Sequence, residues 1–243
     1  MDITKILEET INNIYLIKKD EIPNIDLYMD QVTTFMDSHL KDHKRNDEDK
    51  TLTKTMINNY AKNDLLPSPN KKKYSKEHIL LLTLIYYYKS VMSINDIKKL
   101  MAPITERYFQ GDAGRDMSYI YDEIISHEKD IISIARDDMF SKIELSKSAF
   151  EDAPKKEQDY LQMYAFVSLL SFDVYMKKQL IESIIDSLPS PMSKEERDKI
   201  AIEKAKAARR AAEKKAAEKK SSVAKKTPNS EKKTSTGKNS TDR

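Results

Sequence analysis

The sequence contains no cysteine and no tryptophan, and only 3 of its 243 residues are glycine. The lack of cysteine excludes disulfides, thiolate metal sites and thiol nucleophiles. Few glycines mean few tight hairpins, and the chain has no glycine-rich phosphate loop, nucleophile elbow or paired-carboxylate pattern. The sequence therefore favours a mainly α fold, and we expect a protein that is not an enzyme and carries no cofactor.

Long apolar runs are missing from the N-terminal end of the chain. Acidic residues and lysines interrupt every apolar stretch of the first 30 residues, which argues against a signal peptide and a transmembrane helix. We therefore expect a soluble, cytoplasmic protein. Because 34% of the residues are charged, part of the chain is expected to lie outside any packed core.

Charge is distributed unevenly along the chain. Residues 194–243 carry 17 basic and 8 acidic side chains, whereas the rest of the chain carries 26 basic and 32 acidic ones. The body is therefore acidic and the tail basic. Residues 50–76 reverse the sign locally, because they hold 7 lysines and a single acidic residue.

Apolar spacing and capping residues place three helices in the first part of the chain. We expect one helix that ends at the Pro23–Asn24 break and a second over about residues 26–40. The following ten residues, 41–50, contain no apolar side chain and are expected to form an exposed loop. Thr53 can cap a third helix, which should end near Asp64.

Two further caps follow in the sequence. Ser75 precedes a segment that is apolar nearly all round, which predicts a helix buried inside a domain. Ser93 and Asp96 form an S-x-x-D capping box, which predicts a short helix over residues 94–101. The composition then becomes acidic, and we expect a domain boundary after residue 101.

The second half of the sequence predicts long helices over about residues 116–140 and 155–188. The second of these is strongly apolar and needs a partner, in the same chain or in a second copy. A capping box at Ser193 and Glu196 opens a helix rich in Ala, Lys and Glu, which has no apolar face. From about residue 221 the tail is expected to be disordered.

The third helix and the segment after it fit a winged helix-turn-helix, in which one helix enters the major groove and a wing grips phosphate. Asn can bond adenine through two hydrogen bonds, and Lys can reach guanine or phosphate. The candidate DNA contacts are Lys54, Thr55, Asn58, Asn59 and Lys62 on the helix, and Lys71, Lys72 and Lys73 on the wing.

Residues 52–101 resemble the DNA-binding domain of the mercury-resistance-regulator (MerR) superfamily. In that domain a Tyr-Tyr pair ends a helix, Gly-Leu-Leu follows, and a basic wing leads through Tyr-Ser into the next helix. The matching structural positions here are Tyr60, Leu65, Leu66 and Tyr74. The resemblance implies a homodimer that pairs through helices after the wing.

The stretches "IDLYMDQV" and "MINNYAKNDLLPSPNKKKYSKEHI" resemble a bacterial family more closely, namely domain of unknown function eighteen thirty-six, over about residues 20–125. The function of that family is itself inferred from MerR similarity. This chain has Asn58 and Asn59 where MerR members have Arg-Tyr, Asp64 in place of glycine, and a longer loop at 41–51. The arginine contact of MerR proteins therefore does not transfer to Asn58.

Simpler explanations remain open for these features. The three wing lysines could form a solvated turn, Asn58 and Asn59 could be surface or capping residues, and Tyr86–Tyr88 could be core rather than a stacking platform for single strands. His39 and His43 are spaced to share a metal but lack a fixed third ligand, so no metal site is expected. The basic tail could aid solubility, act as a spacer or slide on DNA, and a membrane role is not expected.

The residue patterns and the resemblance together predict four parts: an N-terminal helix (1–23), a winged helix-turn-helix domain (24–101), a helical dimerisation or effector region (102–188) and a basic tail (189–243). The first functional hypothesis is a sequence-specific protein that binds double-stranded DNA and regulates transcription as a homodimer, with an unknown effector. The second is a non-enzymatic scaffold that keeps the winged fold and binds a protein partner. The acidic body fits the second hypothesis better.

Overall fold

The computed structural model describes residues 2–46, 48–49, 51–111 and 115–190, and a few isolated residues between 196 and 210. The chain divides into two units, residues 1–191 and 192–243. Described residues of the second unit, such as Ile202 and Glu203, are helical. The expected cap at Ser193 and the disorder expected from residue 221 lie outside the described residues.

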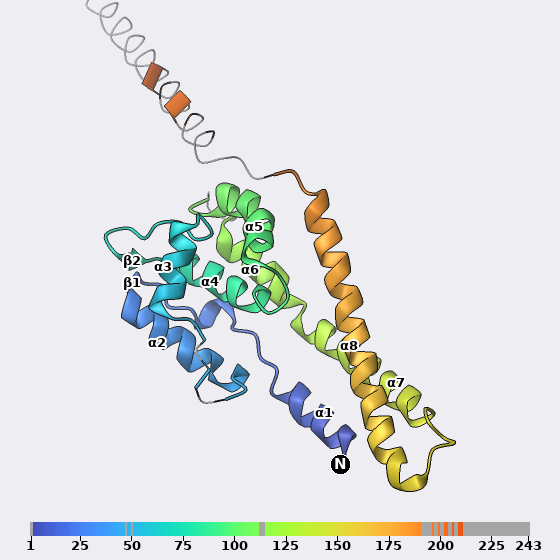
Figure 1. Ribbon diagram of the computed structural model, residues 1–243. Helices are drawn as coiled ribbons and strands as arrows, with labels where there is room; N and C mark the ends of the chain where they lie inside the picture. The colour runs from blue at the N-terminus through green and yellow to red at the C-terminus, as the bar shows by residue number, and fades with distance from the viewer. Residues whose placement is uncertain are drawn as a thin grey trace, which may run out of the picture. The chain divides into compact units, whose positions relative to one another are not determined.

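The first unit is mainly helical, as expected, and its described residues include one small antiparallel sheet. Its α-helices and strands are labelled in Figure 1. In chain order they are α1 (Ile3–Asn12), the 3₁₀ turn η1 (Lys19–Glu21), β1 (Leu27–Tyr28), α2 (Met29–Leu40), the 3₁₀ turn η2 (Lys41–His43), α3 (Lys54–Lys62), β2 (Lys73–Tyr74), α4 (Lys76–Tyr88), α5 (Ile94–Tyr108), α6 (Met117–Ser126), α7 (Glu128–Lys147) and α8 (Lys155–Ser187).

Helix α4 lies at the centre of the main core. All of its residues from His78 to Ile85 are buried, so the expectation of a buried helix is confirmed. Buried side chains from α2, α3, α5 and α6 belong to the same core, as do Leu65 and Leu66. Thr83, a buried polar residue in α4, donates a hydrogen bond to the carbonyl oxygen of Ile79 at 2.9 Å, so its hydroxyl is not left unsatisfied.

Helix α3 ends in a left-handed turn at Asp64. The amide of Leu65 donates to the carbonyl of Tyr60 at 2.9 Å, and the amide of Asp64 donates to that of Ala61 at 3.3 Å. This pair of bonds defines a Schellman motif, whose first residue past the helix cap needs a positive φ. The φ of Asp64 is 57°, in the left-handed region that favours glycine.

Several expected helix limits are wrong. The first helix ends at Asn12 rather than at Pro23. The second begins at Met29, because Leu27 and Tyr28 form strand β1. Helix α5 continues through Pro103 to Tyr108, so the boundary expected after residue 101 falls inside a helix. The caps at Thr53, Ser75 and Ser93 are confirmed.

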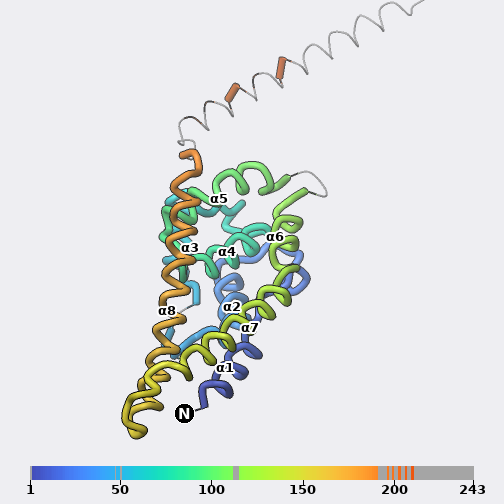
Figure 2. Tube along the Cα trace, turned by 90° about the vertical axis from the view of Figure 1, so that its right-hand side faces the viewer, coloured from blue at the N-terminus to red at the C-terminus, as the bar shows by residue number. Residues whose placement is uncertain are grey.

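The helix expected over residues 116–140 is two helices, α6 and α7, which meet at His127. The long helix expected over residues 155–188 is confirmed as α8. Helices α1, α7 and α8, which we call the arm, share a second core built on Leu7, Ile11, Ile143 and Phe166. Helix α8 runs back along α7, and its C-terminal part reaches α5 (Figures 1 and 2). There the ammonium of Lys99 on α5 donates to the carbonyl of Asp186 on α8 at 3.2 Å. No helix among the described residues is both long and apolar enough to cross a membrane.

The segment between α1 and η1 joins the arm to the main core. Its residue Ile17 is fully buried, donates its amide to the Tyr87 hydroxyl at 3.0 Å and accepts at its carbonyl from the Tyr121 hydroxyl at 2.6 Å. The buried carboxylate of Glu128 accepts from the amide of Leu16 at 2.7 Å and from the ammonium of Lys18. Burial is the main cause that raises the pKa of Tyr87 to about 12, so its hydroxyl stays protonated and able to donate or accept.

Candidate nucleic-acid interface

The outward face of α3 carries the helix residues that the sequence singled out. Thr53 caps the helix by accepting from the amide of Met56 at 3.2 Å, and Ile57 and Tyr60 fix the opposite face in the core. This arrangement leaves one polar side of the helix open to solvent. The exposed residues on that side are Lys54, Thr55, Asn58, Asn59 and Lys62.

Contacts from α2 and α4 hold the segment that enters α3. The ammonium of Lys89 donates to the carbonyl of Thr51 at 2.8 Å, and the Thr51 hydroxyl donates to Asp37 at 3.3 Å. The same Asp37 carboxylate pairs with Lys44 at 2.6 Å, which lowers the pKa of the Asp37 carboxyl. The long loop before α3 is therefore tied down at both ends, and α3 starts from a fixed position.

The segment that we call the wing, residues 70–73, is a tight two-residue turn. The amide of Lys73 donates to the carbonyl of Asn70 at 2.9 Å, and the two central residues, Lys71 and Lys72, have φ angles of 48° and 65°. These values are typical of a type I′ turn, which strongly prefers Asn-Gly at its centre. A lysine in the left-handed region costs roughly 1–2 kcal/mol, so the wing carries two charged side chains at the expense of stability.

Strand pairing anchors the wing next to the start of α2. Strands β1 and β2 are antiparallel, with Leu27 opposite Tyr74 and Tyr28 opposite Lys73. The Lys73 ammonium lies 5.3 Å from the centroid of the Tyr28 ring, a cation–π distance. Figure 1 shows the wing and α3 on the same side of the domain.

The candidate lysines differ in how free they are. Lys54 forms an ion pair with Asp30 at the start of α2, and Lys73 lies over Tyr28. For Lys62, Lys71 and Lys72, which are exposed, the described part of the chain provides no ion-pair partner. The structure therefore brings a smaller set of free cations to this surface than the sequence suggested.

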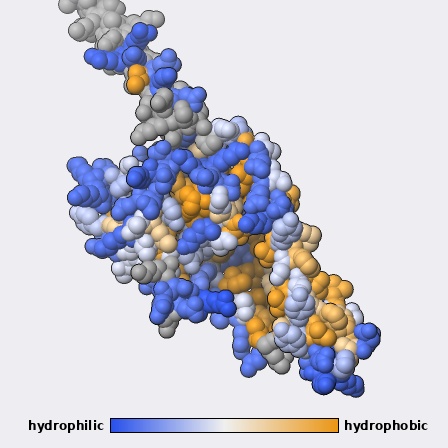
Figure 3. Space-filling model, viewed as in Figure 1, coloured by the Kyte–Doolittle hydropathy of each residue, from blue (hydrophilic) through white to orange (hydrophobic). Residues whose placement is uncertain are grey.

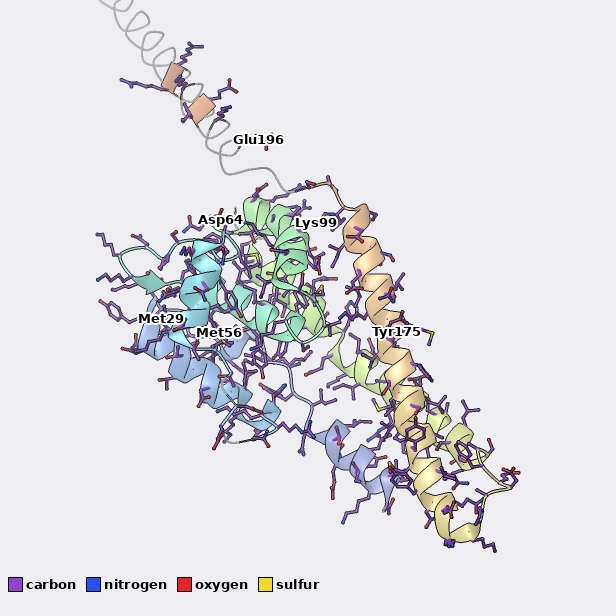
Figure 4. The ribbon with its side chains drawn as sticks, in the orientation of Figure 1. Met29, Met56, Asp64, Lys99, Tyr175 and Glu196 are labelled. Atoms are coloured by element: carbon purple, nitrogen blue, oxygen red, sulfur yellow. The ribbon has the colours of Figure 1, made fainter. Side chains whose placement is uncertain are left out.

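Sequence reasoning missed two residues at this surface, Tyr28 and Asp30. Tyr28 is 54% exposed beside the wing, and Asp30 competes for Lys54. Both lie in the stretch "IDLYMDQV", but their neighbours are distant in sequence, so no local signal pointed to them. Figure 4 labels Met29, the residue after Tyr28, at the start of α2, and Met56 and Asp64 toward opposite ends of α3.

The other sites weighed from the sequence have local explanations. The His39 ring lies 4.1 Å from the Phe35 ring, and its Nδ1 is 3.0 Å from the Phe35 carbonyl oxygen. Among the described residues no group of three or more histidine, aspartate or glutamate side chains could hold a metal ion. Tyr86, Tyr87 and Tyr88 pack against the main core.

Comparison with known proteins identifies the segment that contains this surface. Residues 17–124 match the family described as Domain of unknown function (DUF1836). We call residues 17–124, which make up less than half of the chain, the DUF1836 domain. Neither a curated protein nor a solved structure matches the chain.

His78 ties the wing of the DUF1836 domain to its core. Its Nδ1 accepts from the amide of Ser75 at 3.0 Å, and its ring packs edge-on against Tyr74 and Phe109. Burial lowers the pKa of His78, although nearby carbonyls of Ser68 and Pro67 act in the opposite direction. The ring is therefore held in its neutral form in the folded protein.

The lowered pKa predicts that acid destabilises the DUF1836 domain. The folded state binds fewer protons than the unfolded state, so the free energy of unfolding should fall as pH drops below about 6.5, by up to about 1.4 kcal/mol per unit of pKa difference. His78→Gln keeps an acceptor for the Ser75 amide but does not titrate, so its stability should depend less on pH. Urea unfolding at pH 7.5, 6.5 and 5.5 measures this difference.

The exposed His127 offers a matched control for this measurement. His127→Gln makes the same chemical change at a side chain that is 62% exposed, and so controls for the substitution itself. Burial raises the pKa of Glu77, so Glu77 adds to the free energy of unfolding as the pH falls. This contribution is the same in all three proteins. Parallel curves for His78→Gln and the wild type would contradict the assignment.

Proposed function

We propose that the DUF1836 domain is a winged helix-turn-helix that binds double-stranded DNA, with α3 in the major groove and the 70–73 turn on the phosphate backbone. The strained lysine turn is the observation that carries the proposal. Asn-Gly would suit the turn better, so Lys71 and Lys72 are explained by their charge rather than by folding. Lysines at the tip of a rigid turn are suited to phosphate contact.

The outward face of α3 supports base readout in this proposal. Asn58 and Asn59 are exposed side by side at the middle of the helix, and Thr55 and Lys62 flank them on the same side. Asparagine pairs with adenine through two hydrogen bonds, and lysine reaches guanine or phosphate. Lys54 is the exception, because its pair with Asp30 must open before it can contact DNA.

We further propose that the protein acts as a homodimer through α8. Tyr160, Tyr164, Val167, Ser171 and Val174 follow heptad spacing, and Tyr160 and Val174 are 67% and 61% exposed. Further along the same stripe Ile185 is buried where α8 meets α5. The heptad positions of α8 are thus covered within the chain at Ile185, and the stretch from Tyr160 to Val174, which ends before Lys178, is open. Figure 3 shows hydrophobic residues gathered over α7 and α8, whereas the side of α2 and α3 is largely hydrophilic.

Charges at the ends of the open stripe favour an antiparallel pair. Glu157 precedes the stripe and Lys178 follows it, both at the same heptad position. In a parallel pair Glu157 would face Glu157 of the second copy, and Lys178 would face Lys178. In an antiparallel pair Glu157 faces Lys178 of the second copy. A two-fold dimer of this kind would bind a palindromic DNA site.

The proposal assigns the protein a non-enzymatic role in transcription regulation, and DNA access implies a cytoplasmic location. A scaffold function remains the second candidate, because α8 carries another exposed apolar row. Its members are Phe172, Met176, Leu180 and Ile184, at intervals of four residues. That row, together with the acidic body, suits a protein partner better than DNA. Tyr175 lies beside it on α8 (Figure 4).

Replacing the wing lysines should change the free energy of unfolding and the DNA affinity in opposite directions. Lys71→Asn with Lys72→Gly should raise the free energy of unfolding by about 1 kcal/mol, because both residues then suit a type I′ turn. The same variant should bind a duplex more weakly, with the slope of log K against log salt reduced by about 1.8. Fluorescence anisotropy on residues 1–190 measures the slope without the basic tail. Lys71→Arg with Lys72→Arg keeps charge and strain, and should bind as the wild type does.

If the variant with Lys71→Asn and Lys72→Gly keeps the wild-type slope of log K against log salt, the wing does not contact DNA. If residues 1–190 of the wild type bind no duplex at low salt, the DNA-binding mechanism itself is wrong. The scaffold function would then be the better explanation of the fold.

Asn58→Ala tests base readout. Selection from randomised duplexes should show that the preference at one base position is relaxed, with about 1–3 kcal/mol of discrimination lost there. Asn95→Ala, an exposed asparagine in the first turn of α5, should leave the preference unchanged. Uniform weakening at every base position would make Asn58 a positioning residue.

Val167→Asp tests the dimer. The side chain is 51% exposed, so the substitution should leave the fold of one copy intact while placing two carboxylates at the centre of the proposed interface. Sedimentation equilibrium on the full chain should show a dimer for the wild type and a monomer for the variant. Ser183→Asp, exposed and off the stripe, should remain dimeric.

A charge exchange tests the orientation of the pair. Glu157→Lys alone should weaken the dimer because lysine then faces Lys178, and adding Lys178→Glu should restore it. If the double exchange does not restore the dimer, the antiparallel arrangement is wrong. A wild-type monomer at all concentrations would contradict the dimer itself.

A further inference from the structure

A small apolar cavity lies between α1, the segment that follows it, and the first half of α7. Its volume is about 190 Å³, and its lining includes Ile11, Ile14, Leu16, Ile131, Ile132 and Met139. Apart from one carboxylate, the side chains that line it are aliphatic or thioether groups. The cavity is separate from α3 and the wing, and the proposed DNA interface does not use it.

The exception is Glu128, and its carboxylate is already engaged. One oxygen accepts from the Leu16 amide at 2.7 Å and the other from the Lys18 ammonium. A charged ligand would therefore lose its hydration without gaining a partner, which is strongly unfavourable. An uncharged apolar ligand loses no hydrogen bond on entry.

Volume narrows the ligand class further. An apolar cavity of about 150 Å³ in another protein stays dry and binds benzene. The present cavity is slightly larger and is partly open to solvent, since Ile14 and Ile131 in its lining are 43% and 58% exposed. It therefore suits a neutral aromatic molecule with one or two rings and little polarity, such as toluene or indole. We propose that the cavity is a binding site for a small uncharged aromatic ligand.

The position of the cavity gives binding a route to the rest of the molecule. Leu16 lines the cavity, and the next residue, Ile17, is hydrogen-bonded through its amide to Tyr87 of α4 and through its carbonyl to Tyr121 of α6. A ligand that pushes against Leu16 therefore acts on the joint between the arm and the main core. The regulatory consequence, a change in duplex affinity when the ligand binds, rests on the proposed DNA-binding function.

Ligand binding is tested without DNA, so that its failure is distinct from failure of the proposed function. Isoleucine methyl spectra of the full chain are recorded during titration with indole, toluene, benzoate and anilinium. The neutral compounds, indole and toluene, should shift the methyl signals of Ile131 and Ile132. The charged compounds, benzoate and anilinium, should not. At ten times its Kd, indole should raise the Tm by about 3–6 °C.

Filling the cavity provides the decisive variant. Ala135, which also lines it, lies on α7, and Ala135→Phe should abolish both the methyl shifts and the rise in Tm. Ala135→Leu is the milder version, used if the larger side chain prevents folding, and should weaken binding at least tenfold. Ile134→Phe, at a neighbouring position that is 69% exposed and does not line the cavity, should bind as the wild type does.

Three results would overturn the site: no methyl shift with either neutral aromatic, equal binding of benzoate or anilinium, or unchanged binding in folded Ala135→Phe. If indole binds but leaves the duplex affinity of the wild type unaltered, the site stands and its regulatory role is wrong. If indole binds and no duplex does, the proposed function fails while the site remains.

Discussion

Helix α4 needs apolar cover on every side, and the arrangement of the DUF1836 domain depends on this requirement. Its residues 78–85 are buried without interruption, and such a helix is stable only when neighbours surround it. Helix α3 supplies Ile57 and Tyr60 to that cover. Burying one side of α3 in this way leaves its polar side outward, so the candidate recognition surface follows from the burial of α4.

Three left-handed residues near this surface show how stability and charge are balanced. Asp64 occupies a position that glycine would fit, but it ends α3 and lets Leu65 and Leu66 turn into the core. Lys71 and Lys72 serve no such packing purpose, since both are exposed. Strain is expected where a side chain is retained for a task other than folding, and this is the basis of the proposed phosphate contact.

The arm and the main core share a joint made of polar contacts rather than apolar packing alone. Tyr87, Tyr121 and Glu128 bind the backbone of one short segment from three different helices. Such a network is fully satisfied only in one geometry, which makes it well suited to transmit a shift of α1 or α7 to α4. The open stripe of α8 lies on the same arm, so the proposed dimer and the proposed cavity ligand would act on connected elements.

The sequence alone determined the features that depend on local chemistry. Thr53 and Ser93 cap helices because their side chains reach amides three residues away, and at the cap Ser75 the contact is instead with the His78 ring nitrogen. Periodicity marked α4 as buried. It also determined which residues of α3 face outward, since helical spacing fixes them once Ile57 and Tyr60 are inward. Only the tertiary structure paired Lys54 with Asp30, set Tyr28 against Lys73, extended α5 past Pro103 and built the joint at Ile17. Each of these depends on partners distant in sequence, whose proximity is set by packing and not by local preference.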